Sequence, residues 1–167
     1  MKKIIVSAVV LLCAIVAVNA QPRAVGGRLA YGAEASYQHG FGDANMLEVD
    51  FGIPGFWGIE AAATYDWIFP ITSWNNAGSW NWYAGVGGGV GWSWWGWANV
   101  GVAGRIGVEY NFGFPLQLSL DWRPVIGPAF YYGYAGSGYY GYAGSGVGFN
   151  VGGLYAGAIS LGIRYRF

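Results

Sequence analysis

Apolar and polar side chains alternate along much of this chain. Over residues 116–123 (LQLSLDWR), each even position is apolar and each odd position is polar or charged. Residues 46–51, 59–67, 102–112 and 159–167 show the same alternation. Successive side chains of a β-strand point to opposite faces, so each segment predicts a strand with one apolar and one polar face.

Seven segments can be assigned to strands, at about 28–38, 45–52, 58–68, 79–90, 100–112, 116–124 and 150–167. Single-chain bacterial membrane barrels have even strand numbers, so one segment has to be divided. We expect the first to divide into 24–31 and 33–40, with a tight turn around Tyr31, Gly32 and Ala33. The alternative is a hairpin within 146–167. The prediction is an all-β fold, a closed antiparallel transmembrane β-barrel of eight strands.

The chain is apolar overall but has no long apolar run after residue 20. Hydrophobic residues make up 54% of the sequence, yet no later stretch approaches the roughly 18 uncharged apolar residues of a membrane helix. Alternation is how a transmembrane strand carries hydrophobicity without such a run. Eight tilted strands of roughly 9–11 residues fit into the chain, and closure would leave no strand edge unpaired in lipid.

The first twenty residues have the pattern of a secretory signal peptide. Lys2 and Lys3 precede an apolar segment, residues 4–18, and Val18 and Ala20 provide the small side chains of a cleavage site. A transmembrane helix is the alternative, but the segment is short and no stop-transfer pattern follows. We therefore expect residues 1–20 to be removed and residues 21–167 to form one outer-membrane β-barrel domain.

Removal of the signal peptide would change the charge of the chain. Cys13 and both lysines lie within it, which leaves six arginines, eight acidic residues, no lysine and no cysteine. This weakly acidic balance offers no basic surface for nucleic acid. A soluble β-sandwich would show the same alternation, but its polar face would be rich in lysine. Arginines instead suit pairing with carboxylates in a crowded interior.

The polar strand faces therefore predict a charge network in the barrel lumen. Its expected members are Arg28, Glu34, Glu48, Asp50, Glu60, Asp66, Arg105, Glu109, Asp121, Arg123, Arg164 and Arg166. Glycines in residues 85–91 (GVGGGVG) fall on both faces and would give these bulky side chains room. An eight-stranded barrel is just wide enough to be filled by side chains, so we expect no open pore.

The sequence contains ten tryptophans and thirteen tyrosines. We expect two aromatic belts at the membrane interfaces, one near each barrel end. The first would contain Trp67, Trp80 and Trp82, and the second Trp92, Trp94, Trp95, Trp97, Trp122 and the tyrosines after residue 130. The alternative for residues 92–97 (WSWWGW) is a carbohydrate-binding loop, because exposed tryptophans can also serve recognition.

An octapeptide, YYGYAGSG, occurs twice in tandem at residues 131–138 and 139–146. Its composition is of low complexity, so we expect no fixed fold for it alone. With a periplasmic C-terminus, residues 125–148 become a long extracellular loop that carries this repeat (131–146) and faces solvent or lipopolysaccharide. The alternative is an adhesive or ligand-contacting surface built of tyrosines.

Few residues are available for catalysis. His39 is the single histidine, and Ser36 and Asp43 are its nearest partners in sequence for a catalytic triad. Strand parity places His39 on the outward face, beside a turn. One histidine and scattered carboxylates form no metal-ligand cluster. We therefore expect no enzymatic activity, no catalytic or metal site and no cofactor.

Three features together resemble the small outer-membrane β-barrel family, of the OmpX and OmpA-transmembrane-domain type. They are the signal segment, residues 109–124 (EYNF…PLQLSLDWRP) and the terminal LGIRYRF (161–167). In that family, alternate apolar residues ending in a C-terminal aromatic are recognised by the barrel-assembly machinery, and Leu161, Ile163, Tyr165 and Phe167 match this assembly signal. The resemblance implies a monomer in the outer membrane of a Gram-negative cell. It implies outer-membrane lipid, lipopolysaccharide, periplasmic chaperones and the assembly machinery as partners.

Three functional hypotheses follow, because a barrel architecture alone does not specify an activity. The leading one is a non-enzymatic barrel with a filled lumen and a structural or surface-contact role. The second is a porin-like narrow channel for small hydrophobic molecules, as in OmpW-type barrels, with glycine-lined gaps near 85–91. The third is a lipid-modifying barrel enzyme that uses His39.

Overall fold

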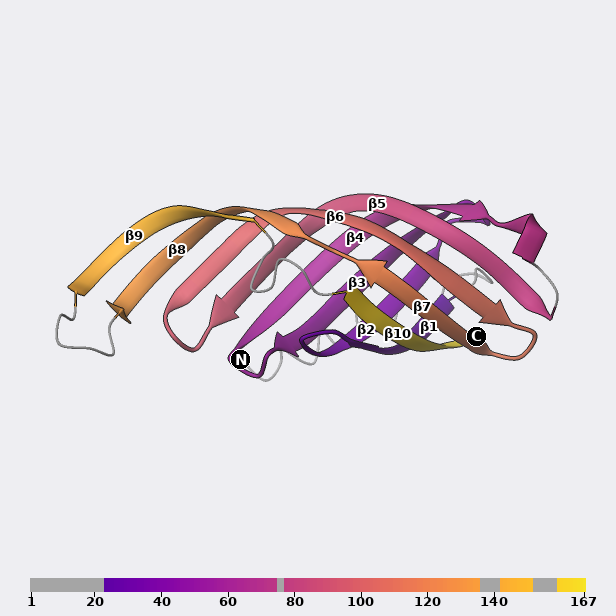
Figure 1. Ribbon diagram of the computed structural model, residues 1–167, viewed down its shortest axis with the longest axis horizontal. Coiled ribbons are helices and arrows are strands. Elements are labelled where there is room, and N and C mark those ends of the chain that lie inside the picture. Colours follow the sequence, from indigo (N-terminus) through magenta and orange to yellow (C-terminus); the bar gives the residue numbers. More distant parts are fainter. Residues whose placement is uncertain (1–22, 75–76, 136–141, 152–158) are drawn as a thin grey trace, which may run out of the picture.

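The computed structural model describes residues 23–74, 77–135, 142–151 and 159–167 (Figure 1). The expected signal peptide, residues 1–20, and part of the octapeptide repeat lie outside the described residues. The described chain forms ten strands and one short 3-10 helix, Thr72–Trp74. Within these ranges, we find no helix that is long and apolar enough to cross a bilayer.

Eight strands close into an antiparallel barrel, which confirms this part of the prediction. They are β1 (Arg23–Leu29), β2 (Gly32–Gly40), β3 (Asn45–Pro54), β4 (Gly58–Pro70), β5 (Gly78–Ser93), β6 (Trp97–Phe112), β7 (Leu116–Trp122) and β10 (Ile159–Arg166). Pairing of β1 with β10 and of β5 with β6 closes the ring. The first alternating segment is divided as expected, because β1 ends at Leu29 and β2 begins at Gly32.

The connections distinguish the two ends of the barrel. The β1–β2, β3–β4 and β5–β6 turns lie at one end, which we call the hairpin end. The β2–β3, β4–β5 and β6–β7 connections lie at the other, the C-terminal end, together with Phe167. In Figure 1, the C-terminus lies toward the right of the molecule, and β8 and β9 extend the curved wall at the left.

The prediction of one long loop over residues 125–148 was wrong. β8 (Val125–Ala135) continues past Pro124 along the first part of β6, and β9 (Tyr142–Val151) pairs with β8. The physical reason is length. β6 has 16 residues and β7 only 7, so the backbone groups of residues 97–103 need another partner.

The octapeptide repeat takes part in this extra hairpin. In the β8–β9 pairing, Tyr131 lies opposite Gly146 and Ala135 opposite Tyr142, so the two copies pair with each other. The alternation was hard to recognise here, because the buried positions of β8 hold Val125, Gly127 and Ala129 instead of polar residues. The segment 150–167 is also not one strand, since β9 ends at Val151 and β10 begins at Ile159.

Side chains of the barrel strands alternate between a buried inner face and an exposed outer face. On β10, Ser160 and Arg164 are buried, whereas Leu161 and Tyr165 are 45% and 57% exposed. The buried interior of the described chain is mainly polar and charged, and most of its apolar members are alanines. The barrel therefore has polar side chains inside and apolar side chains outside.

The glycines of residues 85–91 make room for lumen side chains, as predicted. On β5, the odd-numbered glycines face the lumen and Gly88 faces outward. A Cβ atom at Gly85 would collide with the carboxylate of Asp66 and the backbone oxygen of Tyr65. At Gly88, the nearest atom to an added Cβ is 3.7 Å away.

Gly85→Ala is therefore expected to lower the free energy of unfolding by about 1–3 kcal/mol, the usual effect of overpacking. Gly88→Ala, on the same strand, is expected to be nearly neutral and serves as the control. Urea unfolding of both variants, refolded in detergent micelles, would measure the difference. Equal stability of the two variants would contradict the packing of Asp66 over Gly85.

Candidate functional site: the charge cluster of the lumen

Four arginines and six carboxylates meet inside the barrel, and we call this group the lumen cluster. Its members are Arg28, Arg105, Arg123, Arg164, Glu34, Glu48, Asp50, Glu60, Asp66 and Asp121. They come from seven of the eight barrel strands or, for Arg123, from the residue directly after β7. Their lumen-facing parity brings them together, and barrel closure decides which of them pair.

Arg28 on β1 joins strands from both sides of the barrel. Its Nη1 atom lies 2.5 Å from Glu34 Oε2 and 2.9 Å from Asp50 Oδ2. Its Nη2 atom donates to Asp121 and, over 2.5 Å, to the hydroxyl of Ser160. The Arg28 side chain is only 1% exposed, so its charge is neutralised by these partners and not by bulk solvent.

Arg105 on β6 occupies the centre of the lumen cluster. Its Nη1 atom lies 2.6 Å from Glu48 Oε2 and 3.2 Å from Asp66 Oδ2, and its Nη2 atom lies 3.0 Å from Asp121 Oδ2. Nη2 also donates to the Tyr83 hydroxyl over 3.1 Å, and the guanidinium carbon lies 4.7 Å from the Tyr83 ring centroid. Arg105 thus contacts three carboxylates and an aromatic face at once.

Arg164 on β10 binds Glu48 from the other side. The distance between Arg164 Nη2 and Glu48 Oε1 is 2.5 Å. The remaining nitrogens of Arg164 donate to the hydroxyls of Ser36 (2.9 Å) and Ser119 (2.7 Å). Glu48 therefore lies between Arg105 and Arg164 and pairs with both.

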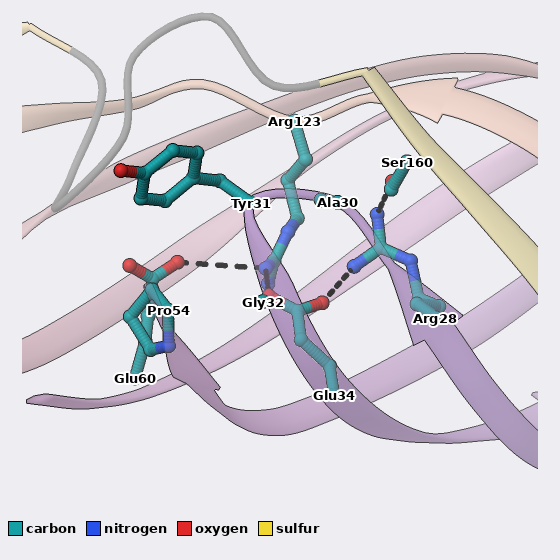
Figure 2. A pocket seen from close by; sticks show the side chains of 9 residues that line it. All are labelled: Arg28, Ala30, Tyr31, Gly32, Glu34, Pro54, Glu60, Arg123 and Ser160. Carbon is teal, nitrogen blue, oxygen red and sulfur yellow. Dashed lines mark hydrogen bonds and ion pairs between the residues drawn. The ribbon is translucent and has the colours of Figure 1, made fainter. Parts of the chain in front are cut away.

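Arg123 closes the cluster at the hairpin end. Figure 2 shows its side chain reaching between Glu34 and Glu60, beside Tyr31. Arg123 Nη2 lies 2.8 Å from Glu34 Oε1 and 3.4 Å from Glu60 Oε1, and Nη1 lies 3.4 Å from Asp50 Oδ2. The cavity that these residues line has a volume of only about 40 Å³, so the lumen is nearly filled here.

Two residues predicted for the network do not join the lumen cluster. Glu109 is buried but makes no ion pair among the described residues, and it accepts hydrogen bonds from amide groups instead. Arg166 is half-buried at the C-terminal end, and no described carboxylate lies within ion-pair distance of it. Both residues line a cavity at the C-terminal end to which none of the four arginines of the cluster contributes, and sequence parity does not report this separation.

Sequence reasoning also missed the neutral polar partners of the cluster. Tyr83 donates to Asp121 over 3.0 Å, and Thr64 donates to Asp66 over 3.0 Å. Gln38 donates to Glu48 over 2.6 Å. Strand parity could have found them, because Tyr83 shares its parity with the lumen-facing glycines of β5.

Aromatic rings gather on the outer face at both barrel ends. Trp92, Trp94 and Trp95 are at least 60% exposed around the β5–β6 turn. Trp97, predicted for the same belt, instead has the lumen-facing parity of β6 and lies opposite the buried Ser93. At the C-terminal end, Trp67 packs edge-on against Tyr65, and Trp80 packs against Tyr110, with ring centroids 5.5 and 4.8 Å apart. The structure thus places rings at both ends.

Trp122 does not lie where its predicted belt requires. It lines the same outer hollow of about 300 Å³ as Trp82, which was expected at the opposite end. The reason is that β7 ends at Trp122, opposite Ile106 in the middle of β6. The end of β7, which the sequence pattern assigned to one end of the barrel, therefore lies partway along the barrel wall.

His39 and the residues considered as its catalytic partners do not form a triad. His39 lies on the outward parity of β2 and packs edge-on against Phe41, with ring centroids 5.0 Å apart. Its Nδ1 atom receives or donates no hydrogen bond among the described residues. Ser36 faces the lumen and donates to Glu48. In the described ranges, no group of three or more histidines, cysteines or acids could hold a metal ion.

In comparisons with protein-family models, curated proteins and solved structures, nothing matches this chain. The features of the chain that bear on its function are therefore the closed barrel, its polar interior and its apolar outer face.

Proposed function

We propose that the protein is an integral outer-membrane β-barrel without enzymatic activity, whose lumen is filled by its own side chains. Its hairpin-end turns and the β8–β9 hairpin would carry a structural or surface-contact role. The observation that carries this proposal is the reversed polarity of the barrel. Charged side chains are buried inside, and large apolar side chains are exposed outside.

This polarity is the opposite of the arrangement that water favours. A soluble protein buries apolar side chains, and a soluble monomer rarely exposes an apolar patch larger than about a few hundred Å². Exposed aliphatic residues occur on many strands here, for example Val25, Val86, Ile106 and Ile163, each 47–51% exposed. A lipid bilayer would cover such a surface, and strand closure would satisfy every backbone group within it.

The aromatic rings at the two barrel ends support the same proposal. Tryptophan and tyrosine are enriched at both membrane–water interfaces, where one side of the ring is apolar and the other is hydrated. We place the C-terminal end of the barrel on the periplasmic side of the membrane. The hairpin end then faces the cell exterior and its lipopolysaccharide. Outer-membrane lipid, periplasmic chaperones and the barrel-assembly machinery are then the proposed partners, with Phe167 and the alternate residues before it as the assembly signal.

Planar-bilayer recordings of the refolded protein are expected to show no steady ohmic conductance. The lumen cluster fills the section between β1, β3, β6 and β10, and the cavity at the hairpin end is about 40 Å³. A porin of known conductance, reconstituted in the same way, is the positive control. A large, steady conductance that depends on this protein would reject the filled-lumen proposal.

No observation in the described residues favours the two alternatives. A channel for small hydrophobic molecules would need open space beside residues 85–91, but Asp66 covers Gly85 and Val125 packs near Gly89. The outer hollow at Trp82 and Trp122 lies in front of Asp121, which is engaged by Arg28 and Arg105. A lipid-modifying enzyme would need polar partners for His39, and its neighbour there is Phe41.

A further inference from the structure

Glu109 differs from the other buried carboxylates of the lumen. Each of the six carboxylates in the lumen cluster lies within 4 Å of an arginine nitrogen, whereas the donors to Glu109 in the described part of the chain are all amides. Its Oε1 atom accepts from Asn81 (2.8 Å) and Asn111 (3.0 Å), and its Oε2 atom accepts from Gln117 (3.0 Å). Glu109 is 3% exposed, so its negative charge is buried without a cation within ion-pair distance among the described side chains.

A cavity of about 160 Å³ lies beside Glu109 at the C-terminal end of the lumen. This volume is roughly ten times the 10–15 Å³ that a single water molecule needs. Gln38, which also lines the cavity, donates its amide nitrogen to Glu48. No described donor reaches the amide oxygen of Gln38, so this oxygen can accept from a molecule in the cavity. Asp43 adds a second, exposed carboxylate at the rim.

The composition of the cavity wall indicates the chemistry of its ligand. The charged side chains of the wall are two carboxylates, Glu109 and Asp43, and one cation, Arg166, so the described lining residues carry a net negative charge. A carboxylate has about four acceptor positions, and three on Glu109 are occupied, so one more donor can bind. That suits an N–H group better than a metal ion that needs several oxygens. Met46 and Ile68 provide an apolar surface on another part of the wall.

We propose that this cavity binds a primary alkylammonium ion. The ammonium group donates to Glu109 and Gln38, and the short alkyl chain packs against Met46 and Ile68. A charge-assisted hydrogen bond to Glu109 neutralises the buried carboxylate, which no arginine of the lumen cluster pairs. The inference concerns the lumen alone and does not depend on the membrane in which the barrel resides.

Isothermal titration of the full refolded chain in detergent micelles would test the proposal, with n-butylammonium chloride as the probe. Tetramethylammonium, which has a charge but no N–H donor, and n-butanol, which has no charge, are the control ligands. Butylammonium is expected to bind at least tenfold more tightly than either. Equal affinity for butylammonium and tetramethylammonium would overturn the proposal, and this comparison needs no variant.

The variant Glu109→Gln has nearly the same shape without the charge, and it is expected to weaken butylammonium binding by about tenfold or more. Glu60→Gln is the matched control, because Glu60 lines the small cavity at the opposite end. The Glu60→Gln variant should bind butylammonium with the same affinity as the unmodified chain. Unchanged binding in a folded Glu109→Gln barrel would place the ligand elsewhere and reject the site. These outcomes are separate from the conductance result, which tests only whether the lumen is filled.

Discussion

Arg105→Met is expected to lower the free energy of unfolding by about 3–5 kcal/mol, the usual effect of removing one partner from a buried ion pair. Methionine replaces the aliphatic part of the side chain but leaves Glu48, Asp66 and Asp121 without their shared cation. The lumen cluster already has six carboxylates and four arginines. Loss of Arg105 would raise the surplus of carboxylates from two to three, and its own three carboxylate partners have no solvent-exposed side-chain surface. Urea unfolding in detergent micelles would measure the change.

Two further variants make this experiment specific. Arg166→Met removes an arginine on the same lumen parity that has no described ion pair, and it should change the unfolding free energy by less than about 1 kcal/mol. Glu48→Gln should be less harmful than Arg105→Met, because it lowers the surplus of carboxylates and retains an amide for hydrogen bonding. If Arg105→Met unfolds at the same urea concentration as Arg166→Met, the lumen cluster does not stabilise the barrel.

Val86→Arg is expected to lower the free energy of unfolding by about 2–4 kcal/mol when the protein is folded into phospholipid vesicles. Val86 is 48% exposed on the outer face and lies at the middle of β5. This position would face the hydrocarbon near the midplane of the proposed bilayer. An arginine there would have to lose its hydration within the hydrocarbon. The measurement is denaturant unfolding in vesicles, with the folded fraction read from heat-modifiable gel migration.

Phe114→Arg is the matched control for this effect. Phe114 is 58% exposed in the β6–β7 turn at the C-terminal end, where the bilayer interface would lie. The same arginine should lower the unfolding free energy there by only about 0–1 kcal/mol. On a soluble protein, either exposed substitution would change the unfolding free energy by about 0.5 kcal/mol or less. Two equally small effects would therefore contradict the membrane proposal and leave the barrel fold intact.

The sequence by itself determined the two faces of the barrel strands, but it assigned most of β8 and β9 to a loop. Alternation has a period of two, and it is a local property that each segment carries without its neighbours. It predicted the eight-stranded closed barrel, the division between β1 and β2, and the lumen-facing parity of Arg28, Glu48 and Arg105. It also separated Ser36 from His39, because even-numbered and odd-numbered residues of β2 point to opposite faces of the strand.

The tertiary structure decided which of these residues meet. Arg28 contacts Asp121, 93 positions away in sequence, and Arg164 contacts Ser36, 128 positions away. Such pairs depend on strand order, register and closure, which a local period does not contain. Strand order, register and closure also place Trp122 beside Trp82 and leave Glu109 with amide partners in place of an arginine. They likewise provide β8 as the partner that the long β6 requires. Local pattern therefore specified the two faces of the barrel, and strand pairing across the closed ring specified its contacts.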